Sequence, residues 1–188
     1  MSLRKKIILI SIMLVLIIST ILVFWTVNNV RQTREPINFA EIIEQGRVDE
    51  LTLAIYYWSP YYLTPRSWGV DDVMDEQRQH VVAGDILKKH IDLLKQLDDA
   101  VLVPVEYEAF LNARMHYVFE HRRSRRTFTV SMWGWGCPDM ERESIFVNGV
   151  AVEEERIFYD VLMQFLPEDL AMELETYLKS FYPPRLMP

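Results

Sequence analysis

The first feature of the hydrophobic pattern is a long uncharged run near the amino terminus. Residues 7–27, IILISIMLVLIISTILVFWTV, contain 21 positions without a charged side chain. A helix of that length spans about 31 Å at about 1.5 Å per residue, which matches the hydrocarbon core of a bilayer at about 30 Å. A cleaved signal peptide has a shorter apolar part and a small-x-small cleavage site, and the sequence has neither. We therefore expect an uncleaved transmembrane signal anchor rather than a cleaved peptide or a buried helix of a soluble protein.

Beyond this run, apolar positions alternate with polar ones in several segments, which is typical of strands. Residues 48–58 predict a first strand, and residues 115–122 and 127–133 predict a hairpin around an arginine-rich turn. Asn148-Gly149 lies between two short apolar pairs and predicts a second, tight hairpin, because both residues tolerate a positive φ. The faces expected to meet in the first hairpin are formed by Met115, Tyr117 and Phe119 and by Phe128, Val130 and Met132.

Other segments have the three-to-four-residue spacing of amphipathic helices. We expect helices over 85–97, 154–165 and 167–180, and a short helix after Asn38, which can cap it. Residues 100–105 are apolar enough for a strand, although Pro104 restricts it to an edge or a strand end. Together these elements predict an α+β domain with a mostly antiparallel sheet of about four to six strands and the helices packed on one face.

The order of the elements divides the chain into parts with different surroundings. Arg4, Lys5 and Lys6 precede the apolar run, whereas only Arg31 and Arg34 follow it closely. Positive residues favour the cytoplasmic side, so we expect a single-pass cell-membrane protein with its domain extracytoplasmic. The predicted parts are a cytoplasmic stub at 1–6, the anchor at 7–27, a tether at 28–37, the domain at 38–182 and a tail at 183–188.

The charge of the exported part limits the partners that it can bind, and its cysteine content limits the disulfides that it can form. The chain has a net charge of -7, and leaving out the three basic residues of the stub lowers it to -10. A domain this acidic repels phosphate backbones, so we expect no nucleic-acid partner. The single cysteine, Cys137, excludes an intrachain disulfide, so the domain must be stable through packing.

Two loops rich in aromatic residues are the first candidates for a ligand-binding surface. Residues 59–69 combine two prolines with three rings, and residues 133–138 separate two tryptophans by glycine. Exposed rings stack on sugars or contact peptide side chains, but rings in such loops also fold back to cover one end of a sheet. The candidate ligand-binding residues are Trp58, Tyr61, Tyr62, Trp68, Trp133 and Trp135.

The turn of the first hairpin, residues 122–126, is the only dense positive patch in the acidic part of the chain. Such a patch can contact lipid headgroups or an anionic wall polymer. It is also typical of a turn that is simply solvated. The candidate residues for anionic contact are Arg122, Arg123, Arg125 and Arg126.

The sequence contains none of the common catalytic motifs. The four histidines form no His-Glu-x-x-His pattern, and neither a phosphate-binding glycine loop nor a Gly-x-Ser-x-Gly sequence occurs. We therefore assign no catalytic residue, cofactor or metal site. The favoured function is a noncatalytic binding domain that contacts an envelope protein, peptide or glycan through the aromatic loops. The alternative is a cell-envelope hydrolase in which acidic residues of the same loops act as general acid and base, with two carboxylates facing each other across a cleft.

Four short segments of the domain carry a resemblance to known proteins. They are His90-Ile91-Asp92-Leu93-Leu94, Phe146-Val147-Asn148-Gly149, Ile157-Phe158-Tyr159-Asp160 and Phe165-Leu166-Pro167-Glu168-Asp169. Over residues 50–180 the chain resembles small membrane-anchored or lipid-anchored extracytoplasmic bacterial domains of unknown function. The resemblance implies an outward-facing α+β domain in a bacterium, and it supplies no activity, substrate or catalytic residue.

Overall fold

A computed structural model describes residues 36–61, 67–75, 79–106, 112–133, 145–153 and 155–181, all within the unit Glu35–Pro188. The predicted anchor at 7–27 lies outside the described residues. Among the helices of the ranges given above, none is both long enough and apolar enough to cross a membrane.

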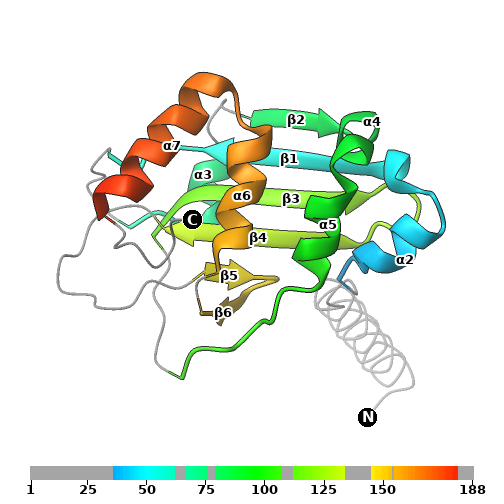
Figure 1. Ribbon diagram of the computed structural model, residues 1–188. Helices are drawn as coiled ribbons and strands as arrows, with labels where there is room; N and C mark the ends of the chain where they lie inside the picture. The colour runs from blue at the N-terminus through cyan, green and yellow to red at the C-terminus, as the bar shows by residue number, and fades with distance from the viewer. Residues whose placement is uncertain are drawn as a thin grey trace, which may run out of the picture. The chain divides into compact units, whose positions relative to one another are not determined.

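The centre of the domain is a six-stranded sheet (Figure 1). Its spatial order is β2-β1-β3-β4-β5-β6, and every neighbouring pair of strands is antiparallel. The predicted α+β class with an antiparallel sheet is therefore confirmed. The strands are β1 (Leu51–Tyr57), β2 (Gln79–Ala83), β3 (Ala113–His121), β4 (Thr127–Trp133), β5 (Ile145–Val147) and β6 (Val150–Val152).

The alternating apolar pattern sets the register of the central strands. Tyr117 of β3 lies opposite Val130 of β4 and Ile55 of β1, and Phe119 lies opposite Phe128. The two pairs between β3 and β4 confirm the prediction that the apolar faces of the hairpin strands meet. All five side chains are buried, and burying a side chain of this kind contributes about 1.5–3 kcal/mol to folding.

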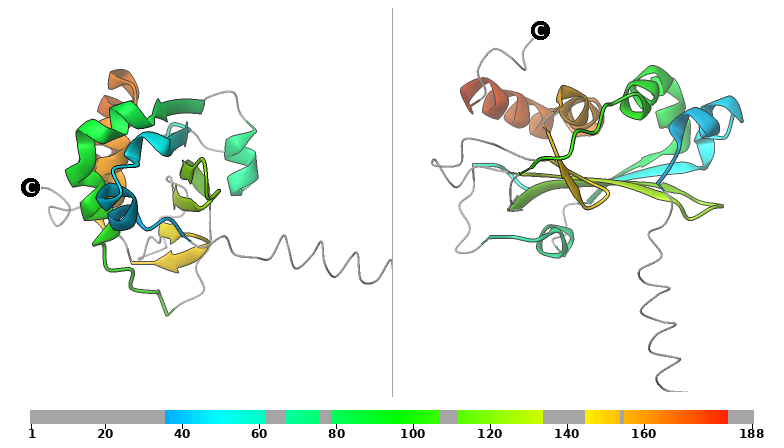
Figure 2. Two further views of the ribbon diagram at one scale, coloured as in Figure 1. Left: turned by 90° about the vertical axis from the view of Figure 1, so that its right-hand side faces the viewer. Right: turned by 90° about the horizontal axis from the view of Figure 1, so that it is seen from below.

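Helices lie on both faces of the sheet. Figure 2 (right) shows α2, α4, α5, α6 and α7 along one face and, of the described helices, α3 on the other. The prediction that the helices pack on one face of the sheet is therefore wrong for α3, which packs against β1 and β3 on the other face. The helices are α2 (Phe39–Glu44), the 3-10 helix η1 (Val48–Glu50), α3 (Val70–Met74), α4 (Gly84–Leu87), the 3-10 helix η2 (Lys88–His90), α5 (Ile91–Asp98), α6 (Arg156–Phe165) and α7 (Glu168–Phe181).

The single helix expected over 85–97 is wrong, because the helical path is interrupted at His90. This residue has a non-helical conformation, with φ -120° and ψ 37°, and α5 begins at Ile91. The two halves have different neighbours: α4 contacts η1 and β1, whereas α5 contacts α2 and α6. The same amphipathic spacing serves one continuous helix or two consecutive ones, so the sequence pattern did not reveal the break.

The strand expected at 100–105 is also corrected, since this segment forms only an isolated bridge. Val105 N donates to Ala151 O at 3.1 Å and holds the segment beside β6. Pro104 bridges Val152 but has no N–H with which to extend the pairing.

The turn between β5 and β6 confirms the hairpin predicted at Asn148-Gly149. The two residues have φ values of 50° and 81°, as a turn of this kind requires. The Asn148 side chain accepts a hydrogen bond from Thr129 N at 2.9 Å, which ties the turn to β4.

The face of the sheet on which α3 packs contains buried polar side chains. Arg114 is 1 % exposed and donates from Nη1 to Asn112 Oδ1 at 2.8 Å. Its guanidinium lies 5.4 Å from the centre of the Trp68 ring, within cation–π range. His116, which is 4 % exposed, forms a 2.8 Å hydrogen bond between Nδ1 and Ser131 Oγ. These contacts compensate part of the cost of burying polar groups on this face.

Burial lowers the pKa of His116 from 6.5 to about 4, which leads to a prediction about stability. Between these values the unfolded chain binds a proton that the folded chain does not, so the free energy of unfolding decreases as the pH falls, by about 3 kcal/mol in all. We expect His116→Asn to remove this part of the pH dependence in denaturant titrations of the full chain in nonionic detergent. Nuclear magnetic resonance should show a neutral ring over most of the range, and a ring that titrates at 6.5 contradicts the prediction.

A second prediction concerns the close contact between α4 and η1. A Cβ added at Gly84 would lie 2.5 Å from the backbone oxygen of Asp49, so no side chain fits there. We expect Gly84→Ala to lower the free energy of unfolding by about 1–3 kcal/mol in denaturant titrations. The matched control is Gly69→Ala, where the nearest atom would be 3.8 Å away and little change is expected. Equal stability of the two variants would show that α4 can move without cost.

Candidate functional site

Several of the aromatic residues predicted to bind a ligand pack against other rings of the domain. Trp58 and Trp68 are half-buried and pack edge to face, with ring centroids 5.0 Å apart. Tyr61 is 44 % exposed, and its ring packs edge-on against Tyr177 of α7 at 5.5 Å. Contacts of this kind are typical of rings that cover one end of a sheet, and the ligand-binding role stays a prediction.

The two aromatic segments meet at the start of β3. Ala113 pairs with Trp133 of β4, and Ala113 N donates to Trp68 O at 2.8 Å. The structure therefore brings Trp58 and Trp68 together and places the backbone of Trp133 beside them. Tyr62 and Trp135 lie outside the described residues.

The second predicted site, residues 122–126, closes the β3–β4 hairpin and is called the arginine turn below. His121 N donates to Arg126 O at 3.0 Å, and Arg125 N donates to His121 O at 2.9 Å. Arg125 has a φ of 56°, a left-handed conformation that the turn requires at this position. Arg126 is half-buried, and the exposed arginines are Arg122, Arg123 and Arg125.

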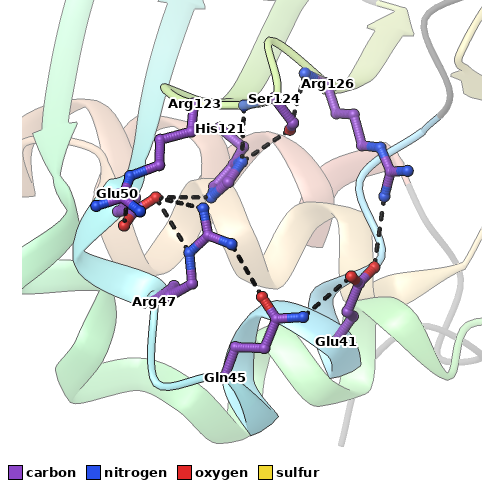
Figure 3. A network of polar contacts seen from close by, with 8 residues as sticks. All are labelled: Glu41, Gln45, Arg47, Glu50, His121, Arg123, Ser124 and Arg126. Atoms are coloured by element: carbon purple, nitrogen blue, oxygen red, sulfur yellow. Dashed lines mark hydrogen bonds and ion pairs between the residues drawn. The ribbon is translucent and has the colours of Figure 1, made fainter.

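Glu50, which directly precedes β1, ties the arginine turn to the domain through its carboxylate (Figure 3). Arg47 donates to Glu50 Oε2 from Nη2 at 2.8 Å and from Nε at 3.2 Å. Arg123 Nε lies 3.1 Å from Glu50 Oε1, and His121 Nε2 lies 3.2 Å from Oε2. The hydrogen bond from Arg47 is the largest of the causes that hold the pKa of Glu50 below its usual value, and the charge of Arg123 adds to it.

His121 connects this carboxylate to Ser124. Its Nδ1 accepts from Ser124 N at 3.3 Å and lies 2.7 Å from Ser124 Oγ. A ring nitrogen that accepts a backbone proton leaves the ring proton of the neutral histidine on Nε2, which faces Glu50. Serine, histidine and glutamate are also the residue types of a hydrolytic triad. Here Nε2 makes no hydrogen bond with a described residue and the carboxylate is shared with two arginines, so these three residues do not form the hydrogen-bonded chain of a triad.

A cavity of about 290 Å³ lies between α2 and the arginine turn. The start of α2 is positioned by Asn38, whose Oδ1 accepts from Glu41 N at 2.7 Å. The Glu41 carboxylate then accepts from Gln45 Nε2 at 3.1 Å and from Arg126 Nη1 at 3.4 Å. Of the described residues that line the cavity, Glu41 is the one carboxylate. The hydrolase hypothesis places its paired carboxylates in the aromatic loops and stays a prediction.

Sequence reasoning found the four arginines of the turn but missed the residues around them. Arg47 and Glu50 are three positions apart, which was the one local signal of an ion pair. No signal connected either residue with His121 or Ser124. In the part of the chain that the structure describes, no group of three or more His, Cys, Asp or Glu residues is placed to hold a metal ion.

Comparison of the chain with protein families, with curated proteins and with solved structures finds no match in any of the three. The resemblance to bacterial extracytoplasmic domains stays a prediction. The interpretation of the site therefore rests on its own geometry and charge.

The ion pairs of Glu50 predict how stability depends on pH. They hold its pKa below the ordinary value of 4.5, so the unfolded chain binds the proton first as the pH falls. Stabilisation by the charged form is present above pH 4.5 and is lost in more acidic solution. We therefore expect Glu50→Gln to lower the Tm of the full chain in nonionic detergent at neutral pH, with the two Tm values converging in acid.

The control for this measurement is Glu44→Gln, which neutralises an exposed carboxylate on α2. It should change the Tm little at any pH, because surface charges of this kind contribute little to stability. A difference between wild type and Glu50→Gln that stays constant from neutral to acidic pH would show that the charge of Glu50 is not the stabilising element.

Proposed function

We propose that this chain is a membrane-anchored extracytoplasmic binding domain that contacts the anionic surface of its own membrane through the arginine turn. One observation carries the proposal. Ile37 N donates to Thr127 O at 3.3 Å, and Pro36 forms a bridge with the same residue. Thr127 directly follows Arg126, so the described chain enters the domain beside the arginine turn.

The length of the tether supports a position close to the membrane. Eight residues, 28–35, separate the predicted anchor from Pro36. A fully extended chain covers at most about 3.6 Å per residue, so such a tether reaches about 30 Å. With residues 7–27 in the bilayer, the entry point beside the arginine turn stays within that distance of the end of the span.

The distribution of charge favours contact through the turn. Arginines near an anionic lipid surface contribute about 1 kcal/mol each, and the attraction decays over a Debye length of about 8–10 Å. Arg123 and Arg126 are partly neutralised by Glu50 and Glu41. Arg122 and Arg125 form no ion pair with any described residue and are exposed, so these two carry most of the proposed contact.

The test compares the full chain in nanodiscs of phosphatidylcholine with the same chain in nanodiscs that also contain phosphatidylglycerol. We expect amide hydrogen exchange in the arginine turn to slow by about threefold or more with the anionic lipid, because contact excludes water from the turn. High salt and the double variant Arg122→Gln/Arg125→Gln should each abolish the difference. Exchange in α7 should be the same in both lipids.

The matched control is Lys88→Gln/Lys89→Gln, which changes the net charge equally at two exposed positions of η2. It should retain the protection of the turn. Equal exchange of the turn in both lipids overturns the proposal. Protection by a soluble poly(glycerol phosphate) in neutral nanodiscs, without protection by anionic lipid, would assign the contact to a wall polymer instead and would also overturn it.

A further inference from the structure

We propose that the cavity between α2 and the arginine turn is a binding site for a single phosphate-ester group of a small molecule or headgroup. This site is distinct from the surface contact proposed above, because Arg122 and Arg125 do not line it. It is formed by side chains of α2, of the segment before η1 and of the turn. The two sites can therefore be tested separately.

The charge of the lining selects for anions. Arg47, Arg123 and Arg126 line the cavity, and Glu41 is the one carboxylate among the described lining residues, which gives the lining a formal charge of +2. Glu50, which pairs with Arg47 and Arg123 from outside the lining, lowers the charge of the cluster to +1, and a phosphate ester has the opposite sign of charge. Ile42 is the one apolar residue among the described lining residues, and the others carry polar or charged groups.

Arg47 is held in place before any ligand arrives. Figure 3 shows Arg47 and Arg126 on opposite sides of the space between α2 and the turn, with Gln45 and Glu41 below it. Arg47 is fixed by Glu50 and also donates from Nη1 to Gln45 Oε1 at 3.0 Å. Side chains ordered in this way lose little conformational freedom on binding, and planar guanidinium groups match phosphate oxygens in geometry.

The contact between Arg126 and Glu41 provides the place where an anion enters. Its distance of 3.4 Å is longer than a strong charge-assisted hydrogen bond. A phosphate oxygen can therefore compete with the Glu41 carboxylate for this guanidinium group. Ser124 lines the same space as a neutral polar residue.

The volume limits the size of the ligand. The volume of about 290 Å³ is just below the range of ligand-binding cavities, which starts at about 300 Å³. An inorganic phosphate ion leaves part of this space unfilled, whereas a phosphate ester with a glycerol-sized substituent fills it better. We therefore expect glycerol 3-phosphate to bind more tightly than inorganic phosphate.

The test is calorimetric titration of the full chain, in nanodiscs of phosphatidylcholine alone, with glycerol 3-phosphate and with inorganic phosphate. Because this lipid carries no net charge, the outcome does not depend on the surface contact. Saturable binding by wild type should weaken by about tenfold or more in Arg126→Gln and in Arg47→Gln, since each loses charge-assisted hydrogen bonds. The remote variant Arg156→Gln on α6 should bind like wild type.

A further variant separates loss of the site from loss of the fold. Glu41→Gln keeps an oxygen for Gln45 to donate to but removes the negative charge from the cavity, so it should bind glycerol 3-phosphate about threefold tighter or more. A misfolded variant cannot gain affinity. Absence of saturable binding by wild type overturns the proposal, as does an Arg126→Gln variant of wild-type affinity or a Glu41→Gln variant of lower affinity.

Repeating the titration in nanodiscs that contain phosphatidylglycerol distinguishes two sources of the same chemical group. A lower apparent affinity for glycerol 3-phosphate there, absent in Arg126→Gln, identifies the lipid headgroup as a competing occupant. Unchanged affinity identifies a soluble phosphate ester. Both results support the site. We expect the same titration results in the variant Arg122→Gln/Arg125→Gln, in which the surface contact is lost.

Discussion

The burial of one face of β1, β3 and β4 is the constraint on which the rest of the structure depends. Ile55, Tyr117 and Val130 lie side by side across these strands and are fully buried under the helices. A slip of one residue in any strand would turn its apolar side chains to the other face, at a cost of about 1.5–3 kcal/mol for each. The register is therefore fixed, and it places Leu51 of β1 opposite His121 of β3.

That register assembles the candidate site. Glu50 directly precedes Leu51, so its carboxylate reaches the base of the arginine turn, and its backbone oxygen accepts from Arg122 N at 3.1 Å. Arg47 comes from the turn before η1 and completes the cluster. Charged groups that are about seventy residues apart along the chain thus meet because apolar side chains elsewhere in the same strands are buried.

On the opposite face of the sheet, a packed helix buries polar residues that the sequence pattern places on an exposed face. In the alternation of β3, Arg114 and His116 fall on the side away from the apolar core, where solvent exposure would be expected. Instead α3 packs against β1 and β3, and both side chains are buried. Desolvation lowers the pKa of Arg114, and the hydrogen bond to Asn112 and the ring of Trp68 offset part of that cost.

By itself, the sequence determined the features that depend on neighbouring residues. The β3–β4 hairpin, the Asn148-Gly149 turn and the arginine turn all follow from local spacing and from local backbone preference. The structure alone decided the break at His90, the position of α3, the strand order and the pairing of Glu50 with the turn. Each of these depends on which distant surfaces are buried against each other, and the periodicity of a single segment carries no information about its partner.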